Sequence, residues 1–256
     1  MLTLNYKEFG QGEPLVILHG LFGMLDNWQT IAKQLAEHFT VFLVDQRNHG
    51  KSPHSTEHNY EVMSEDLHDF MTSKWIFKAH LIGHSMGGKT AMRFATEYPD
   101  FLKTLTIVDI APKTYQPGHE QIFKALLSIR PENLSSRKEA SIILEESIKD
   151  GAIRQFLLKN LSKVKDGQYR WKMNLPVIHK NYVNIIKCSL GDDIFEGKTL
   201  FIKGGQSGYI QMDDLPMIQN HFPKATIQTI DSVGHWVHAE APKAFLQILG
   251  DFLLKA

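Results

Sequence analysis

The sequence predicts an α/β fold with a mostly parallel central sheet, helices on both faces of the sheet, and an all-helical insertion. Short apolar runs that end in Gly, Asp or His alternate with amphipathic helical patterns, which is the order that builds a parallel sheet. Most of these runs are apolar throughout, as strands covered on both faces require. The alternation stops after Asp109 and resumes near residue 199, and this gap marks the insertion.

Seven segments are predicted to be strands, because each is short, rich in apolar residues and bounded by polar residues or glycine. The first, MLTLNYKEF at 1–9, alternates apolar and polar residues. The others follow in chain order: PLVILHG (14–20), TVFLVDQ (40–46), HLIGHS (80–85), KTLTIVDI (103–110), TLFIKGG (199–205) and ATIQTID (225–231).

Helical patterns fill the connections between these strands. Asp26 is placed to cap a helix through residues 28–39, and Tyr60 to Met71 carries apolar residues at helical spacing. A third helix covers residues 86–98 and stops before a proline, and a final helix begins near Pro242.

Residues 113–190 form the insertion, and residues 1–112 and 191–256 form the core domain. The insertion shows no convincing strand, only amphipathic stretches that predict helices at 119–129, 138–148, 153–161 and 177–190. We expect a lid over the carboxyl edge of the sheet, where ligands bind in such folds. The lid contains fourteen Lys and Arg against seven Asp and Glu. One interpretation is attraction of an anionic substrate, such as the phosphates of coenzyme A; the other is a solvated basic surface.

The overall composition is that of an ordinary globular protein. Of 256 residues, 43% are hydrophobic and 22% charged, with a net charge of zero. No run of eighteen apolar residues occurs, so we predict no membrane span. We also predict no nucleic-acid partner. The single cysteine, Cys188, cannot form an internal disulfide, and no Cys/His pair has zinc spacing. These features favour a reducing cytoplasm and predict no metal site.

The candidate nucleophile is Ser85, within Gly83-His84-Ser85-Met86-Gly87. This stretch fits G-x-S-x-G, and it lies between a predicted strand and a predicted helix, as the motif requires. A serine in such a strained turn crowds its neighbours, so only glycines two positions away let the backbone close around it.

The same stretch also fits the phosphate-loop pattern G-x-x-x-x-G-K-[ST], through Gly83, Gly88, Lys89 and Thr90. Asp109, at the end of a strand, resembles a magnesium ligand of such nucleotide hydrolases. This alternative leaves the glycine-flanked serine unexplained. Under the serine-nucleophile interpretation, Lys89 is instead expected to be an exposed residue on the first turn of the helix.

A serine hydroxyl needs a base, and His235 is the best placed of thirteen histidines. Gly234-His235-Trp236 follows the last predicted strand and precedes the final helix, which puts His235 on a loop at the carboxyl edge. Surface or hydrogen-bonding roles are expected for His238 and for the cluster His49, His54 and His58.

Acyl transfer also needs at least two N–H donors for the oxyanion of its tetrahedral intermediate. His19-Gly20-Leu21-Phe22-Gly23 follows a buried strand and supplies one donor from Leu21 or Phe22. Met86, at the helix amino terminus, supplies the other.

The segments HGLFG, VDQRNHGKS, GHSMGGK, VDIAP, GGQSGY and GHWVHAE together resemble the YbfF-type esterases of the α/β-hydrolase superfamily, and the resemblance spans the whole chain. It implies an α/β-hydrolase fold with a cap over the site. It also implies hydrolysis of short-chain acyl esters and acyl-CoA thioesters without metal or organic cofactor.

The catalytic acid departs from the common superfamily pattern. The loop that usually carries it reads GGQSGYIQMDD, with Ser207 where an aspartate is expected and Asp213 and Asp214 several residues later. Asp109, at the end of the neighbouring strand, is within reach of the histidine and matches the acid of YbfF-type esterases. We assign Asp109, with Asp213 or Asp214 as the alternative. Ser207 is an auxiliary residue expected to hydrogen-bond to His235 or Asp109.

The function predicted is therefore a serine esterase or thioesterase acting on a small acyl substrate. A small-molecule receptor or a carbon–carbon bond hydrolase on the same fold are alternatives, because fold does not fix the reaction. Asp45 and Arg47 are expected to tie down the loop after their strand. Aromatic residues of the lid are candidates to line the pocket: Phe123, Phe156, Trp171 and Tyr182. The sequence makes no prediction of oligomeric state.

Overall fold

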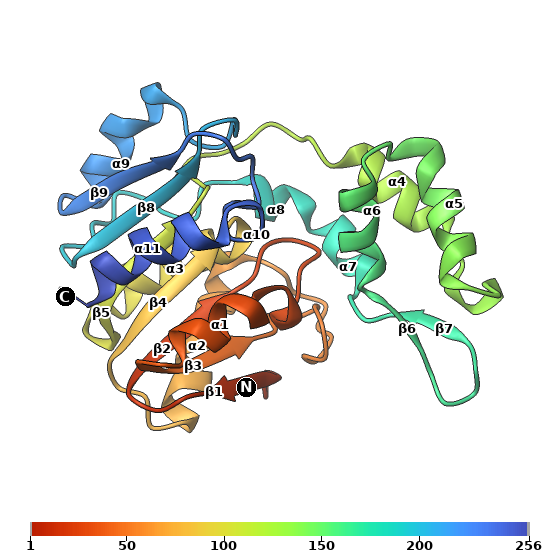
Figure 1. The fold of residues 1–256 in the computed structure, drawn as a ribbon, viewed down its shortest axis with the longest axis horizontal. Helices are drawn as coiled ribbons and strands as arrows, with labels where there is room; N and C mark the ends of the chain where they lie inside the picture. The colour runs from red at the N-terminus through yellow and green to blue at the C-terminus, as the bar shows by residue number, and fades with distance from the viewer. Residues whose placement is uncertain (1, 255–256) are drawn as a thin grey trace.

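The computed structural model describes residues 2–254 and contains a seven-stranded sheet of order β1-β3-β2-β4-β5-β8-β9 (Figure 1). All neighbouring pairs are parallel except β1 with β3. The mostly parallel sheet and all seven predicted strands are confirmed. Their bounds are β1 Tyr6–Phe9, β2 Glu13–Leu18, β3 Phe39–Val44, β4 Ala79–His84, β5 Leu102–Val108, β8 Thr199–Gly204 and β9 Ala225–Ile230.

Helices cover both faces of this sheet and bury both sides of its strands. Helices α1 (Gln29–Leu35) and α11 (Pro242–Leu253) pack on one face. Helices α2 (Tyr60–Ser73), α3 (Met86–Glu97) and α9 (Leu215–His221) pack on the other, and α9 was not predicted.

The strand β2 explains why the apolar runs are continuous. Leu15 and Ile17 belong to the hydrophobic cluster under α1 and α11, whereas Val16 and Leu18 belong to the cluster under α2 and α3. Because successive side chains of a strand point to opposite faces, a central strand needs apolar residues at every position. All four side chains are at most 1% exposed, and each stabilises the fold by roughly 1.5–3 kcal/mol.

The insertion forms a separate lobe beside the sheet (Figure 1). Its helices are α4 (Glu120–Ser128), α5 (Arg137–Ser147), α6 (Gly151–Leu158), α7 (Leu175–Lys180) and α8 (Tyr182–Ile186). The lobe has a hydrophobic cluster of its own, which also takes in Phe22, Tyr60, Met63 and Met86 of the core. The lid is thus packed onto the core at the start of α3.

Two local predictions were wrong. The insertion is not all-helical, because β6 (Leu161–Lys163) and β7 (Tyr169–Trp171) form an antiparallel hairpin. Strands of three residues are too short to show an alternating pattern in the sequence. Asp26 does not cap α1; it lies in a short 3₁₀ turn before that helix, and its carboxylate pairs with Lys7 at 2.7 Å.

Within residues 2–254, no helix is both long enough and apolar enough to cross a membrane.

Candidate active site

Ser85 lies in the turn that joins β4 to α3, with a φ of 53° and a ψ of −118°. The glycines on either side of it are sterically required. A Cβ on Gly87 would lie 2.6 Å from the carbonyl oxygens of Leu18 and His19, and one on Gly83 would collide with the carbonyl of Gly87. The Ser85 N–H donates to the Val108 carbonyl on β5 at 3.0 Å. The strained turn predicted from the sequence is therefore present.

Asp109 follows β5, is fully buried, and also has a positive φ, of 52°. Its Oδ1 accepts the Gly204 N–H at 3.0 Å. Its Oδ2 accepts the Ser207 hydroxyl and lies 2.7 Å from Nδ1 of His235. A carboxylate held by these three donors is fixed in position and oriented toward the imidazole.

The alternative acids are not placed to touch His235. The Asp214 carboxylate accepts from Lys113 Nζ at 2.6 and 2.7 Å and from the Gln211 N–H at 2.8 Å. The Asp213 side chain is exposed to solvent. Both residues belong to a 3₁₀ turn that leads into α9, so the chain has already left the sheet edge where they occur.

His235 lies on the loop after β9, and the tautomer follows from its partner. Because an ionised carboxylate only accepts hydrogen bonds, Nδ1 carries the proton and Nε2 is left as an acceptor. The Tyr209 ring stacks on the imidazole with ring centroids 4.0 Å apart. His84, the neighbour of Ser85, bonds through Nε2 to the His235 carbonyl at 2.9 Å. No hydrogen bond joins the Ser85 hydroxyl to His235 among the described residues.

Glu240 anchors the loop of His235, and it was not among the residues predicted from the sequence. It lies on α10 (Val237–Glu240), and its carboxylate accepts the Gly234 N–H at 2.8 Å and the Trp236 N–H at 3.1 Å. The backbone on both sides of His235 is therefore anchored by one side chain. The signal was present in GHWVHAE, where an acidic residue follows the histidine within one short turn.

The two oxyanion-donor candidates of the HGLFG loop, Leu21 and Phe22, differ in whether their N–H group has an acceptor within the protein. The Phe22 N–H donates to His49 Nε2 at 3.3 Å and therefore already has an acceptor within the protein. The Leu21 and Met86 N–H groups have no protein acceptor within residues 2–254. Leu21 and Met86 also line the cavity beside Ser85. The geometry therefore favours Leu21 and Met86.

Two neutral histidines, His19 and His49, fix the HGLFG loop through hydrogen bonds. His19 Nε2 accepts the Gln46 N–H, so its Nδ1 donates to the Gly20 carbonyl. His49 Nδ1 likewise donates to the Arg47 carbonyl at 3.0 Å, which leaves Nε2 to accept from Phe22. Burial lowers the pKa of His19 to about 4 and that of His49 to about 3, so both rings stay neutral near pH 7.

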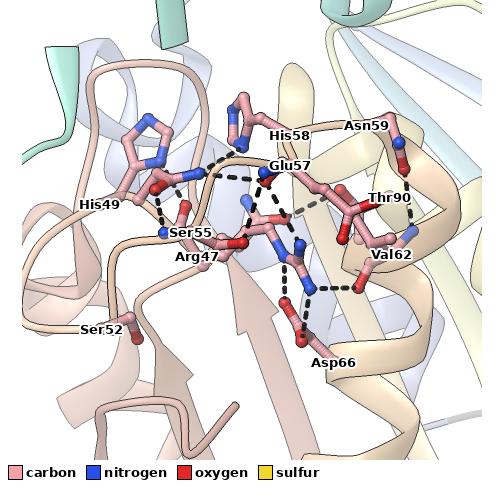
Figure 2. Close-up of polar contacts among 12 residues, drawn as sticks. Arg47, His49, Ser52, Ser55, Glu57, His58, Asn59, Val62, Asp66 and Thr90 are labelled. Carbon is pink, nitrogen blue, oxygen red and sulfur yellow. Dashed lines mark hydrogen bonds and ion pairs between the residues drawn. The ribbon is translucent and has the colours of Figure 1, made fainter. Parts of the chain in front are cut away.

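A buried ion pair fixes the next segment of the chain. The Arg47 guanidinium donates to the Asp66 carboxylate at 2.6 and 2.9 Å and also to the Glu57 and Val62 carbonyls (Figure 2). Asp45 accepts the N–H groups of Leu25 and Lys51. The prediction that Asp45 and Arg47 tie down their loop is confirmed.

A cavity of about 220 Å³ opens beside Ser85, between the core and the lid. Of the four aromatic residues proposed to line it, only Tyr182 does so. Phe123 is buried inside the lid, Phe156 packs against Trp236, and Trp171 lies on the hairpin strand β7. Tyr60, Tyr115 and Tyr209 form much of the wall instead, together with His119 and Ile185.

The phosphate-loop interpretation is wrong, as is the expected exposure of Lys89. The Lys89 side chain is 1% exposed, and its Nζ donates to three backbone carbonyls. The Thr90 hydroxyl is hydrogen-bonded to Gln46 and to the Met86 carbonyl. Neither side chain is available to phosphate or magnesium. The described residues contain no cluster of three or more His, Cys, Asp or Glu arranged to hold a metal ion.

Comparison with known proteins gives consistent results. The family model described as alpha/beta hydrolase fold matches residues 13–242. The chain is 39% identical to the sn-1-specific diacylglycerol lipase ABHD11 of Danio rerio, over 98% of this chain and 83% of that protein. It is 36% identical to Esterase YbfF of Escherichia coli, over 94% and 92% of the two chains. A solved structure named Marine microorganism esterase superposes with a TM-score of 0.97 at 46% identity, covering 99% of this chain and all of that one. The resemblance to YbfF-type esterases is confirmed.

Proposed function

Because the chain belongs to the alpha/beta hydrolase fold family, we propose that it is a serine esterase with Ser85 as nucleophile, His235 as base and Asp109 as acid. The observation that carries this proposal is the 2.7 Å contact between Asp109 Oδ2 and His235 Nδ1, at the same sheet edge as the strained Ser85 turn. The relatives named as esterases and lipases support the same reaction class.

In this mechanism, the Ser85 Oγ attacks the carbonyl carbon of an ester while His235 Nε2 takes the hydroxyl proton. The bond between the carbonyl carbon and the leaving oxygen then breaks, and His235 returns the proton to the alcohol that leaves. Water attacks the acyl-enzyme in the same way, which releases the acid and restores Ser85. Nδ1 stays bonded to Asp109 throughout, so the imidazole keeps its orientation when it is charged.

The N–H groups of Leu21 and Met86 are the proposed oxyanion donors. Both line the cavity, and Met86 is the first residue of α3, where backbone N–H groups have no acceptor within the helix. His49 supports the Leu21 donor indirectly, because it holds the next N–H, that of Phe22, away from the cavity.

We propose Ser207 as an auxiliary residue that acts through Asp109. Its hydroxyl donates to the carboxylate oxygen that also contacts His235. The same hydroxyl accepts the Tyr209 N–H at 3.2 Å, and the Tyr209 ring stacks on His235. Ser207 therefore links Asp109 to Tyr209, whose ring packs against the face of the His235 imidazole.

The proposed substrates are short-chain carboxylic esters and, by the same chemistry, acyl thioesters including acyl-CoA. A cavity of about 220 Å³ walled largely by tyrosine and isoleucine side chains suits a small acyl group. The excess of basic residues in the lid suits an anionic leaving group. The test replaces two exposed lysines of the hairpin, Lys163 and Lys165, with neutral residues. If the ratio of rates on anionic and neutral esters is the same in the variant as in the wild type, the proposed role of the basic residues is refuted. We also propose a cytoplasmic location, which suits one unpaired cysteine.

The experiment is labelling by a fluorophosphonate probe together with steady-state hydrolysis of p-nitrophenyl esters. We compare the wild type with Ser85→Ala and with Ser147→Ala, a matched change at an exposed serine on α5. Labelling and turnover that are lost only in Ser85→Ala support the esterase. Labelling without turnover of any ester favours a receptor or a carbon–carbon bond hydrolase, and labelling that survives Ser85→Ala refutes the proposed nucleophile.

A further inference from the structure

Lys89 is a buried lysine that the proposed catalytic steps do not use. Burial lowers its pKa to about 7, and hydrogen bonds to carbonyl oxygens favour its charged form. It lies one helical turn after Ser85, and its backbone N–H donates to the Ser85 carbonyl at 3.1 Å. No ion pair within residues 2–254 includes its side chain. Its Nζ instead contacts the carbonyl oxygens of Lys113 at 2.8 Å, Ile186 at 3.1 Å and Lys187 at 2.6 Å. Three acceptors match the three N–H bonds of an ammonium group.

These carbonyls belong to the two places where the chain crosses between core and lid. Lys113 is the first residue of the insertion, on the way out of β5. Ile186 and Lys187 are the last residue of α8 and the one after it, on the way back to β8. The final carbonyls of a helix have no partner within it, and a positive charge there is favourable. One ammonium group thus joins both crossings to the helix that carries the nucleophile.

Neighbouring contacts fix the same crossings. The Tyr60 hydroxyl, from α2, donates to the Ile185 carbonyl at 2.7 Å. The Tyr115 N–H donates to the Ile186 carbonyl at 2.8 Å, which ties the outgoing segment to the returning one. The Lys89 Nζ also lies 4.9 Å from the centre of the Tyr115 ring, within the range of a cation–π contact.

The crossings form part of the cavity wall. Tyr60, Lys89, Tyr115, Ile185 and Ile186 all line the cavity beside Ser85. A shift of either crossing therefore changes the width of the space in which a substrate would lie. Loss of the ammonium would leave the Lys113 and Lys187 carbonyls without this donor, whereas the Ile186 carbonyl would keep the Tyr115 N–H. The two freed carbonyls regain a partner only when the backbone moves or water enters.

We propose that Lys89 is a positioning residue that fixes the lid to the helix of the nucleophile and thereby sets which acyl lengths the cavity accepts. This inference rests on the proposed ester hydrolysis for its substrate class. Its structural part, the attachment of the lid, does not depend on that reaction. The expected consequence of losing the ammonium is a looser lid and a weaker preference for short acyl chains.

The test compares Lys89→Met, which keeps a long side chain but removes the donors, with Lys187→Met. Lys187 is exposed, and Lys89 contacts its backbone carbonyl, so this control removes a lysine ammonium but leaves the proposed contact in place. The first measurement is kcat/KM for p-nitrophenyl acetate, butanoate, octanoate and decanoate. The second is amide hydrogen exchange of Tyr115, which bonds to Ile186, and of Cys188, which bonds to Thr114 Oγ1.

For Lys89→Met, we expect the butanoate-to-decanoate ratio of kcat/KM to fall by about tenfold, the effect of one or two lost buried hydrogen bonds. Exchange at Tyr115 and Cys188 should accelerate together, and both readouts should be unchanged in Lys187→Met. The same ester profile and the same exchange rates in Lys89→Met as in the wild type would overturn the proposal.

If Lys89→Met does not fold, Lys89→Gln gives the same test on a smaller scale, because its carboxamide keeps at most two N–H donors on a shorter side chain. Faster exchange at Tyr115 supports the proposal, and unchanged exchange refutes it. If no form of the protein is labelled at Ser85 or hydrolyses esters, the proposed function fails. The exchange measurement then still decides whether Lys89 holds the lid.

Discussion

Replacing Asp109 with asparagine tests the proposed acid with little change in volume. The new carboxamide must still satisfy the Gly204 N–H, which lies 3.0 Å from Oδ1 of the native side chain. If the amide oxygen stays there, the NH₂ group takes the place of Oδ2 and points at His235 Nδ1. In the opposite orientation, the NH₂ group would face the Gly204 N–H, so two donors would meet, at a cost of roughly 1–3 kcal/mol. The orientation with the amide oxygen toward Gly204 is therefore preferred.

The preferred orientation forces the wrong histidine tautomer. Nδ1 must then accept a hydrogen bond, so the ring proton moves to Nε2, the atom that should take the proton from Ser85. We expect kcat to fall by about 10⁴-fold, which corresponds to roughly 5.5 kcal/mol of barrier. KM should change by less than about threefold, because Asp109 is fully buried and does not line the cavity.

The assay is steady-state hydrolysis of p-nitrophenyl butanoate, with circular dichroism to verify folding. Asp214→Asn is the matched control, since Asp214 is the alternative acid and contacts Lys113 instead of His235. Its kcat should stay within about threefold of the wild type. A kcat for the Asp109→Asn variant above about one tenth of the wild-type value, or an equal loss in the control, would refute the assignment.

The same contacts predict the effects of three other changes. Ser207→Ala should lower kcat about 3- to 10-fold by removing one hydrogen bond to Asp109, and an unchanged rate and pH profile would remove Ser207 from the mechanism. Arg47→Met should lower the free energy of unfolding, measured in urea, by about 3–5 kcal/mol, because Asp66 is left buried without its partner. The double variant Arg47→Met, Asp66→Leu should lose much less stability. Equal losses in the two variants would contradict this reasoning. Acid should destabilise the fold. Burial lowers the pKa of one histidine to about 4 and that of two others to about 3. Below about pH 6.5 the unfolded chain therefore binds protons that the folded chain does not. The free energy of unfolding should then fall by up to about 1.4 kcal/mol per pH unit for each ring. The three are His19, His49 and His238. His238→Phe, which keeps a ring stacked on Trp28, should reduce the slope by up to about 1.4 kcal/mol per pH unit, and an unchanged slope would disprove the contribution of His238.

Backbone strain marks this site more sharply than residue type does. Five non-glycine residues between 2 and 254 have a positive φ, and three of them, Phe22, Ser85 and Asp109, lie in the proposed catalytic loops. Such conformations cost of order 1–3 kcal/mol each and persist only where the surroundings impose them. The sequence indicated the strain at Ser85, through its flanking glycines, but contained no comparable signal for the other two.

The wrong predictions have a common physical cause. Lys89 was expected to be exposed because lysine usually is, yet its neighbours on α3 are buried on every side of the helix, so the charge had to find acceptors inside. Phe22 and Leu21 were indistinguishable as donors because the choice depends on His49, which comes from a different loop. The three-residue strands of the hairpin are too short to give a pattern.

The sequence by itself determined the succession of strands and helices along the chain, the position of the insertion, the Ser85 turn and the loop of His235. Each of these depends on neighbours within a few residues: apolar runs, helical spacing, or the steric need for glycine. Only the tertiary structure decided that Ser207 and His235 share one carboxylate oxygen of Asp109, that Leu21 is the free N–H, and that Lys89 joins the lid to α3. Those contacts join residues 24 to 126 positions apart, and their geometry is set by packing, which a local pattern does not encode.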